Sequence, residues 1–521
     1  MRPLKSVAAL LTFLIFCLTF PAAVTSQTQV KEKLPSADKI VDKYLRSIGG
    51  KKRIAAVRDA VFDWRVNIND EAVGVASTKL KAPSSSLMAL TLPGGQVISA
   101  ANSSSAWFKG LDGQVRTLTG MESGAAKLRS ILDARQLLDY KKSNVAARVV
   151  PSGAVESEST FVVEFSTRAG AKLVYHFSKT TGLILRIDDH ARGVTTRFSD
   201  YRPELGLMQP HRVQIRLPGA GDITLVLEKA RYNQGIAVTV FDAPAAEPLN
   251  VADLLRTVGR NQEEVEKRFT EYSFRQKEID RQINSKGEIK KETVKEFEVF
   301  PIANREPILK LISENGVPLS PERAAKEEKR VQEEFLKAER DREKDEAREQ
   351  KRKAERLRRN TAQGEDQDDD VAISQFLKVC EFVSPRRERF RDREAVVFDF
   401  RPRPGFKPSN RQEDLISKLV GVVWIDPADK QVIRLEARLA EGFKMAGGLL
   451  LSLRPGATLV MEQTRMEEGV WLPRLAQINL SIKVLLFGGG DMNKTYEWSD
   501  YRHFKGDVSD YNIETPKAEV V

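Results

Sequence analysis

Two stretches of the chain align without gaps: residues 195–217 read TTRFSDYRPELGLMQPHRVQIRL, and residues 458–480 read TLVMEQTRMEEGVWLPRLAQINL. Eight of the 23 aligned positions are identical, including the glycines Gly206 and Gly469. Each stretch predicts a strand, a turn closed by glycine, and a second strand that starts at a proline, where no N–H is needed. We interpret the pair as an internal duplication. The alternative is that short strand–turn–strand units resemble one another by chance.

Strand patterns continue on both sides of the first stretch. Apolar and polar residues alternate with period 2 in several segments between residues 54 and 242: Leu173/Tyr175/Phe177, Leu183/Leu185/Ile187, Val213/Ile215/Leu217 and Ile223/Leu225/Leu227. This alternation is typical of an antiparallel sheet with one apolar face. A helix at about 122–140 interrupts the strands and is expected to cover that face. Its apolar side carries Leu128, Ile131, Leu132 and Leu138.

The remaining segments give the expected domain organisation. An amphipathic helix at 36–48, capped by Ser36 and stopped by Gly49 and Gly50, opens the first domain. A domain at 36–242 and a linker with a helix at 243–270 are followed by a charged β-meander at 271–318. The next expected segments are a long charged helix at 319–364, an acidic disordered loop at 365–372, and a second half-barrel-like domain at 373–515.

The long helix differs in composition from the rest of the chain. Residues 321–360 contain 15 Lys and Arg, 12 Asp and Glu, and no glycine. Pairs such as Glu333/Lys337 have the i,i+4 spacing that supports a solvated helix. The apolar residues Val331, Phe335 and Ala338 lie only in the first half. We therefore expect a mostly exposed rod that offers a surface to a protein partner of the cell envelope.

The N-terminus predicts export. Arg2 and Lys5 precede the uncharged, mostly apolar segment 7–20, which has the length of a signal-peptide core and is too short to span a membrane. We expect cleavage after Ser26. The alternatives are an uncleaved N-terminal anchor and, less favoured, a lipoprotein. Cleavage leaves Cys380 as the one cysteine, so no intramolecular disulfide is expected and a bacterial periplasm is favoured over another secretory compartment.

These features together resemble the LolA/LolB-like periplasmic lipoprotein-carrier superfamily. The resemblance rests on the helix ending at Gly49-Gly50, the strand-rich segment, and the D-Y-R…G-L-x-x-P element between Asp200 and Pro210. It extends more weakly over 373–504, through Gly469-Val470-Trp471-Leu472-Pro473 and the sequence W-S-D-Y-R at 498–502. It implies an incomplete barrel whose apolar concave face is covered by helices and holds acyl chains. The fold class expected is thus α+β, mainly antiparallel β, with two curved-sheet domains and a long charged helix inserted in the second.

The sequence predicts no enzyme and no cofactor. The chain has four histidines, none paired with another at metal-ligand spacing, and it has no nucleophile-elbow, zincin, P-loop or dinucleotide-binding motif. We expect no metal site, and we interpret Cys380 as inert core on a helix that begins near Ile373. The net charge of +11 is spread among acidic residues and matches no RNA- or DNA-binding pattern, so no nucleic-acid partner is expected.

Apolar surface is the remaining functional signal. The expected function is non-catalytic binding of a lipid, an acylated protein or another hydrophobic ligand. The candidate ligand-binding residues are Leu128, Ile131, Leu132 and Leu138 in the first domain and Met445, Leu449 and Leu450 in the second. The alternatives are an envelope adaptor that binds a protein through its charged helix and, more weakly, a hydrolase with unrecognised residues.

Overall fold

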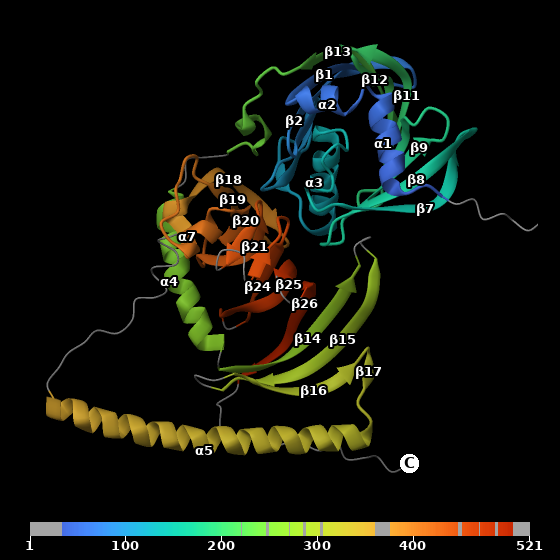
Figure 1. Ribbon diagram of the computed structural model, residues 1–521. Helices are drawn as coiled ribbons and strands as arrows, with labels where there is room; N and C mark the ends of the chain where they lie inside the picture. The colour runs from blue at the N-terminus through green and yellow to red at the C-terminus, as the bar shows by residue number, and fades with distance from the viewer. Residues whose placement is uncertain are drawn as a thin grey trace, which may run out of the picture. The chain divides into compact units, whose positions relative to one another are not determined.

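Each aligned stretch folds into a β-hairpin in the computed structural model of the protein (Figure 1). The strands of the two hairpins are β11 (Val194–Glu204), β12 (Leu207–Leu217), β24 (Thr458–Arg465) and β25 (Trp471–Val484). In the first hairpin Thr195 pairs with Arg216. In the second the aligned residues, Thr458 and Asn479, pair in the same way. The two hairpins therefore begin in the same register.

The structure describes residues 34–503, with short gaps in between. The gaps are at 220, 246–249, 270, 285–287, 303–305, 360–375, 446–450, 468 and 485–487. The expected signal peptide, the acidic loop and the C-terminal residues from 504 onward lie outside this range. None of the helices described here is long and apolar enough to cross a membrane.

The first hairpin belongs to an open antiparallel sheet of thirteen strands, in the order β6-β5-β4-β3-β2-β1-β13-β12-β11-β10-β9-β8-β7. Two meanders, β1 to β6 and β7 to β13, are joined where the first strand pairs with the last. Besides β11 and β12, the strands are β1 (Asp59–Ile68), β2 (Glu71–Lys81), β3 (Ser85–Leu92), β4 (Gly95–Ala101), β5 (Ala106–Lys109), β6 (Val115–Thr117), β7 (Ala146–Val155), β8 (Glu158–Ser166), β9 (Lys172–Ser178), β10 (Ile184–Asp189) and β13 (Gly221–Tyr232).

The second hairpin belongs to another open antiparallel sheet, in the order β17-β16-β15-β14-β26-β25-β24-β21-β20-β19-β18. The short strands β22 and β23 pair with each other beside β25. Besides β24 and β25, its strands are β14 (Tyr272–Ile283), β15 (Ile289–Phe300), β16 (Ile308–Glu314), β17 (Val317–Pro318), β18 (Cys380–Phe390), β19 (Arg393–Pro402), β20 (Leu419–Asp426), β21 (Gln431–Leu439), β22 (Phe443–Met445), β23 (Leu451–Leu453) and β26 (Gly488–His503).

The two strand orders follow the same plan, although the first meander has six strands (β1 to β6) in one sheet and four (β14 to β17) in the other. In each sheet the first strand, β1 or β14, pairs with the last strand, β13 or β26. In each, a helix precedes the first strand, and a second helix joins the two meanders. These helices are α1 (Ala37–Ser47) and α3 (Gly120–Ala134) in the first half, and α4 (Val251–Phe269) and α5 (Pro321–Arg359) in the second. The topology therefore agrees with a duplication.

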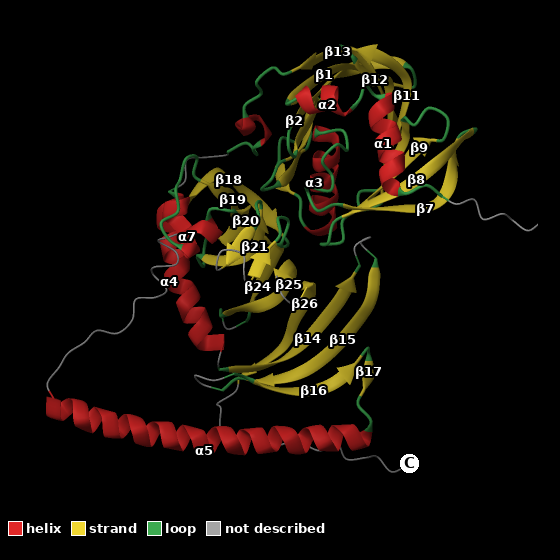
Figure 2. Ribbon diagram, viewed as in Figure 1, coloured by secondary structure: helices red, strands yellow, loops and turns green. Residues whose placement is uncertain are grey.

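The first-half helices follow the sequence patterns closely (Figure 2). Ser36 caps α1 by accepting a hydrogen bond from the Lys39 N–H, as its position before the apolar stripe predicts. A short helix, α2 (Lys51–Ala56), follows. The helix expected at 122–140 is shorter than predicted, because Gln136 and Leu137 take left-handed backbone angles and end it. The turn after α3 still carries apolar residues back onto the sheet.

The second-half helices differ from their counterparts. The predicted long helix is confirmed as α5, but it lies along β16, beside the two-residue edge strand β17, whereas α3 crosses its sheet. The Leu311 N–H donates to Glu327, and Arg330 donates to the Leu309 carbonyl, so α5 satisfies free backbone groups of that edge. Val331 of α5 packs against Ile308, the first residue of β16. The expectation of a helical Cys380 was wrong: helical backbone ends one residue earlier, and Cys380 begins β18, although it is fully buried as predicted.

Candidate ligand-binding face of the first sheet

The first sheet has an inner face, which we define as the face that carries α1 and α3. Strand pairing places alternate residues on it, for example Tyr175, Ile187, Thr196 and Ile215 across β9 to β12. The helix α3 contacts β9 on one side and β2 to β5 on the other, while α1 contacts β7. The inner face is therefore where helix and sheet side chains meet.

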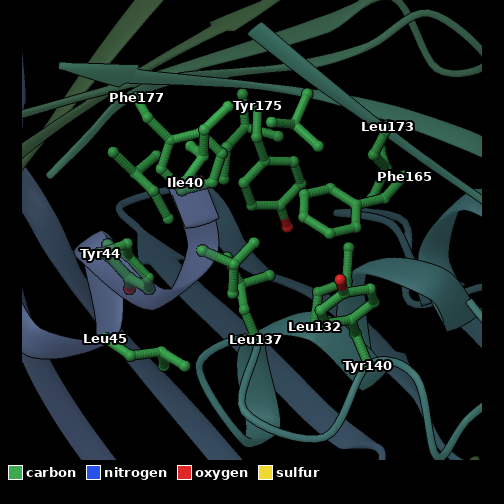
Figure 3. Packing of buried hydrophobic residues seen from close by; sticks show 14 of the residues in the cluster. Ile40, Tyr44, Leu45, Leu132, Leu137, Tyr140, Phe165, Leu173, Tyr175 and Phe177 are labelled. Atoms are coloured by element: carbon green, nitrogen blue, oxygen red, sulfur yellow. The ribbon is translucent and has the colours of Figure 1, made fainter. Parts of the chain in front are cut away.

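Under the helices the inner face is a filled core (Figure 3). Side chains from α1, from α3 and its following turn, and from β8 and β9 point toward one another there. Tyr44 meets Phe177 edge to face at 5.8 Å between ring centroids, and Tyr175 meets Phe165 at 5.0 Å. Such edge-to-face pairs add stabilisation beyond the area that they bury. This part of the sheet is closed by the protein's own side chains.

The four candidate residues of the first domain lie in or against this core. Leu128 and Leu132 are 0% and 1% exposed, so they contact protein rather than an open surface. Ile131 and Leu138 are half-buried and pack against the same cluster. The sequence did not indicate Leu137, which the left-handed turn after α3 brings into the core at 2% exposure.

A second apolar surface occupies the inner face of β1, β12 and β13. Its buried residues include Trp64, Val66, Val213 and Leu225. The register aligns them across the strands, since Leu225 pairs with both Val66 and Val213. Every second residue of these three strands and of β3 faces inward, and none of these inward-facing residues is charged. The segments concerned are 62–68 in β1, 86–92 in β3, 213–217 in β12 and 223–227 in β13. The surface is thus continuous and uncharged.

The rim of this second surface is only half-buried. Five apolar side chains there retain partial exposure while packing against the buried cluster: Ile68, Leu90, Leu92, Ile215 and Leu217. Large apolar side chains that share one face and stay partly exposed are a signature of a ligand- or partner-binding surface. The alternation in β12 and β13 predicted this apolar face from the sequence, but the candidate residues were placed on the covering helix instead.

One ion pair lies on the inner side of α3. Arg129 donates to Asp133 at 2.5 Å, and their side chains are 21% and 29% exposed. At 100° per residue this pair falls between the side of α3 that holds Leu132 and the side where Ser130 donates to the Ser84 carbonyl. The pKa of Tyr175 is raised well above its usual value. The larger cause is burial, and the second is the negative charge of the nearby Asp133 carboxylate.

The hydroxyl of Tyr175 is buried near the Asp133 carboxylate. Burial acts to lower the pKa of Arg129, but the Asp133 carboxylate more than offsets this, and the net pKa is raised. Arg129 therefore stays charged and offers a cation to a polar group at the inner face.

Of the candidate residues of the second domain, the structure describes Met445. Met445 ends β22 and pairs with Leu451, the first residue of β23. Leu449 and Leu450 fall in the gap between these strands, outside the described residues. These three assignments stay predictions.

One histidine of the first sheet, His176, belongs to a network of polar side chains. His176 lies on the outer face, as the alternation of β9 predicts, and its Nε2 is 2.9 Å from Asp188. Arg186 and Thr195 bind the same Asp188 carboxylate. Burial acts to raise the pKa of Asp188, but the His176, Arg186 and Thr195 partners more than offset this, and the net pKa is lowered. Within the described part of the chain, no three His, Cys, Asp or Glu side chains are placed to hold a metal ion.

Comparison with protein-family models and with curated proteins finds no match for this chain. Solved structures similar to part of it include a DUF1329 family protein from Desulfovibrio piger, at 17% identity and a TM-score of 0.27, covering 39% of this chain and 96% of that one. Another is a domain of a protein from Vibrio parahaemolyticus described as a putative outer membrane lipoprotein-sorting protein. Its sequence identity is 13% and its TM-score is 0.27, and the match covers 39% of this chain and 94% of that one. A LolA superfamily protein from Nitrosomonas europaea matches at 14% identity and a TM-score of 0.28, covering 40% of this chain and 98% of that one.

Two of these three proteins are of the kind that the sequence resembles, and each match spans about two fifths of this chain. Their identities and TM-scores are too low to carry an argument about function.

Proposed function

We propose that this protein binds the acyl chain of a lipid or of an acylated protein on the inner face of its first sheet, in the bacterial cell envelope, without catalysis. The observation that carries the proposal is the uncharged apolar surface of β1, β3, β12 and β13, with its half-buried rim. An acyl chain is long, apolar and flexible, so it matches a surface that is continuous across several strands.

The expected affinity follows from the length of chain that the surface buries. Each buried methylene contributes about 0.8 kcal/mol, so about ten of them contribute roughly 8 kcal/mol before ordering costs are subtracted. A Kd of about 1 µM corresponds to roughly −8 kcal/mol, so the net Kd is expected in the micromolar range or weaker. The partly exposed Arg129–Asp133 pair is assigned to the polar linkage of the ligand.

Leu90→Asp tests the proposal on the rim. A carboxylate at this inner-facing, half-buried position must lose hydration when an acyl chain lies on it, so binding of a fluorescent fatty-acid probe is expected to weaken at least tenfold. Thr91→Asp is the matched control, because the next residue of β3 faces the opposite side and is exposed. We expect less than a twofold change for it, measured by probe titration.

Equal weakening by Leu90→Asp and Thr91→Asp would contradict the proposed face. Wild-type protein that binds no fatty-acid or phospholipid probe at high micromolar concentration would contradict acyl binding altogether. The second candidate function is then the better account: an envelope adaptor that contacts a protein through α5. It is favoured by the charged composition of that helix and by its packing along β16.

A further inference from the structure

A buried charged cluster joins the first sheet to the second. From Ser36 onward the chain forms one compact unit, and the cluster lies inside it. Arg386 and Glu388 of β18 and Asp399 of β19 have side chains that are 1%, 5% and 1% exposed. One of their partners from the first half of the chain is Thr117, the last residue of β6. Such burial of three charged groups is rare unless each is paired.

Thr117 binds the second sheet through both its backbone and its side chain. Its N–H donates to Glu388 at 2.8 Å, and its hydroxyl donates to the other oxygen of the same carboxylate at 2.5 Å. The hydroxyl also accepts from Arg386 Nε at 3.0 Å. These contacts fix the position of the end of β6 against β18.

One cation of the cluster, Arg386, faces two carboxylates. Arg386 donates to Glu388 at 2.7 Å and to Asp399 at 3.0 Å. Asp399 also accepts a hydrogen bond from the Ser105 hydroxyl of the first sheet. In a buried network of this kind, removing one member leaves an uncompensated group, so the network behaves as a unit.

The cluster acts on α3 because β6 leads directly into that helix. Thr117 lies three residues before Gly120, where α3 begins. Farther along α3, Lys127 lies 3.9 Å from Glu436 of β21, and Glu436 also accepts from Arg434 at 2.6 Å. The start and the middle of α3 are therefore both attached to the second sheet.

We infer that the second sheet is a clamp on α3, the helix that covers the inner face of the first sheet. For α3 to move away from the inner face, Thr117 must leave the Arg386–Glu388 pair or the helix must unwind from its first turn. The second half of the chain thereby sets how often the inner face is uncovered. The consequence for ligand entry rests on the proposed function, whereas the clamp itself does not.

Hydrogen exchange in the full-length protein tests the clamp directly. Thr117→Val keeps the size and shape of the side chain and removes the hydroxyl, while Arg386 and Glu388 remain paired with each other. We expect the amides of α3 to exchange about tenfold faster in this variant, at conditions where its melting curve is cooperative. Glu388→Gln, which keeps the side-chain volume, is expected to act in the same direction.

Arg401→Gln is the matched control. Arg401 of β19 also joins the two halves, through Asp242 at 3.0 Å, but that contact does not involve β6 or α3. Its α3 amides are expected to exchange at the wild-type rate. Wild-type exchange in both Thr117→Val and Glu388→Gln, or equal acceleration by Arg401→Gln, would overturn the clamp.

A second readout separates the clamp from the proposed function. If acyl chains bind the inner face, a fluorescent fatty-acid probe should associate about tenfold faster with Thr117→Val than with the wild type. Unchanged association despite faster exchange would show that α3 does not control entry and would overturn that consequence. Faster exchange in a protein that binds no probe would support the clamp while removing the acyl-binding proposal.

Discussion

Leu132→Asp is expected to lower the free energy of unfolding by at least about 5 kcal/mol, because truncating a buried leucine costs about 2–5 kcal/mol and an unpaired buried carboxylate costs several more. Leu132 is 1% exposed and lies among the aromatic residues of β8 and β9. The loss is comparable with the whole stability of many domains. Denaturant titration followed by circular dichroism measures it.

Met121→Asp is the control on the same helix. Met121 is 52% exposed and lies in the first turn of α3, where a negative charge is favourable, so a change within about 0.5 kcal/mol is expected. A Leu132→Asp protein as stable as the wild type would show that this residue faces an open site, as the sequence-based assignment predicts, rather than a filled core.

Arg386→Met is expected to cost about 3–5 kcal/mol, because it leaves Glu388 and Asp399 buried without their cation. The triple variant with Glu388→Gln and Asp399→Asn also removes both carboxylates. It should recover most of the loss, since no buried charge is left unpaired. The measurement is again the denaturant midpoint.

The control for this prediction is Arg216→Met. Arg216 and Asp222 form an exposed ion pair on the first sheet, with side chains 61% and 49% exposed, so no measurable change in the denaturant midpoint is expected. A single Arg386→Met variant that matches this control, or a triple variant no more stable than the single one, would show that the cluster does not hold the two halves together.

Local periodicity accounts for most of the fold that could be predicted. The alternation at Val213 to Leu217 and at Ile223 to Leu227 gave strands with the correct inner faces, because a half-buried sheet imposes period 2 on its sequence. The composition of 321–360 likewise predicted α5, since glycine is absent and i,i+4 charge pairs are frequent. The hairpin duplication predicted the matching positions of β11–β12 and β24–β25 in the two sheets.

Features that depend on distant contacts were not predictable in this way. Leu137 reaches the core through a left-handed turn that neither periodicity nor a glycine indicates. The cluster that joins Thr117 to Arg386 brings together residues 269 apart in sequence, and no local pattern marks either as buried. The proposed ligand face differs from the candidate residues for a related reason: Leu128 and Leu132 form a helical stripe whether it meets a ligand or the sheet's own aromatic residues.

Photolabelling with a fatty acid that carries a diazirine on its acyl chain tests the central claim most directly. The wild-type protein is labelled, digested and mapped by mass spectrometry. The account predicts adducts on inner-face residues of the first sheet: Ile68, Leu90, Leu92, Ile215 and Leu217. These adducts should disappear when unlabelled fatty acid competes. Absence of adducts, or adducts confined to α5 and the second sheet, would contradict acyl binding at the inner face of the first sheet.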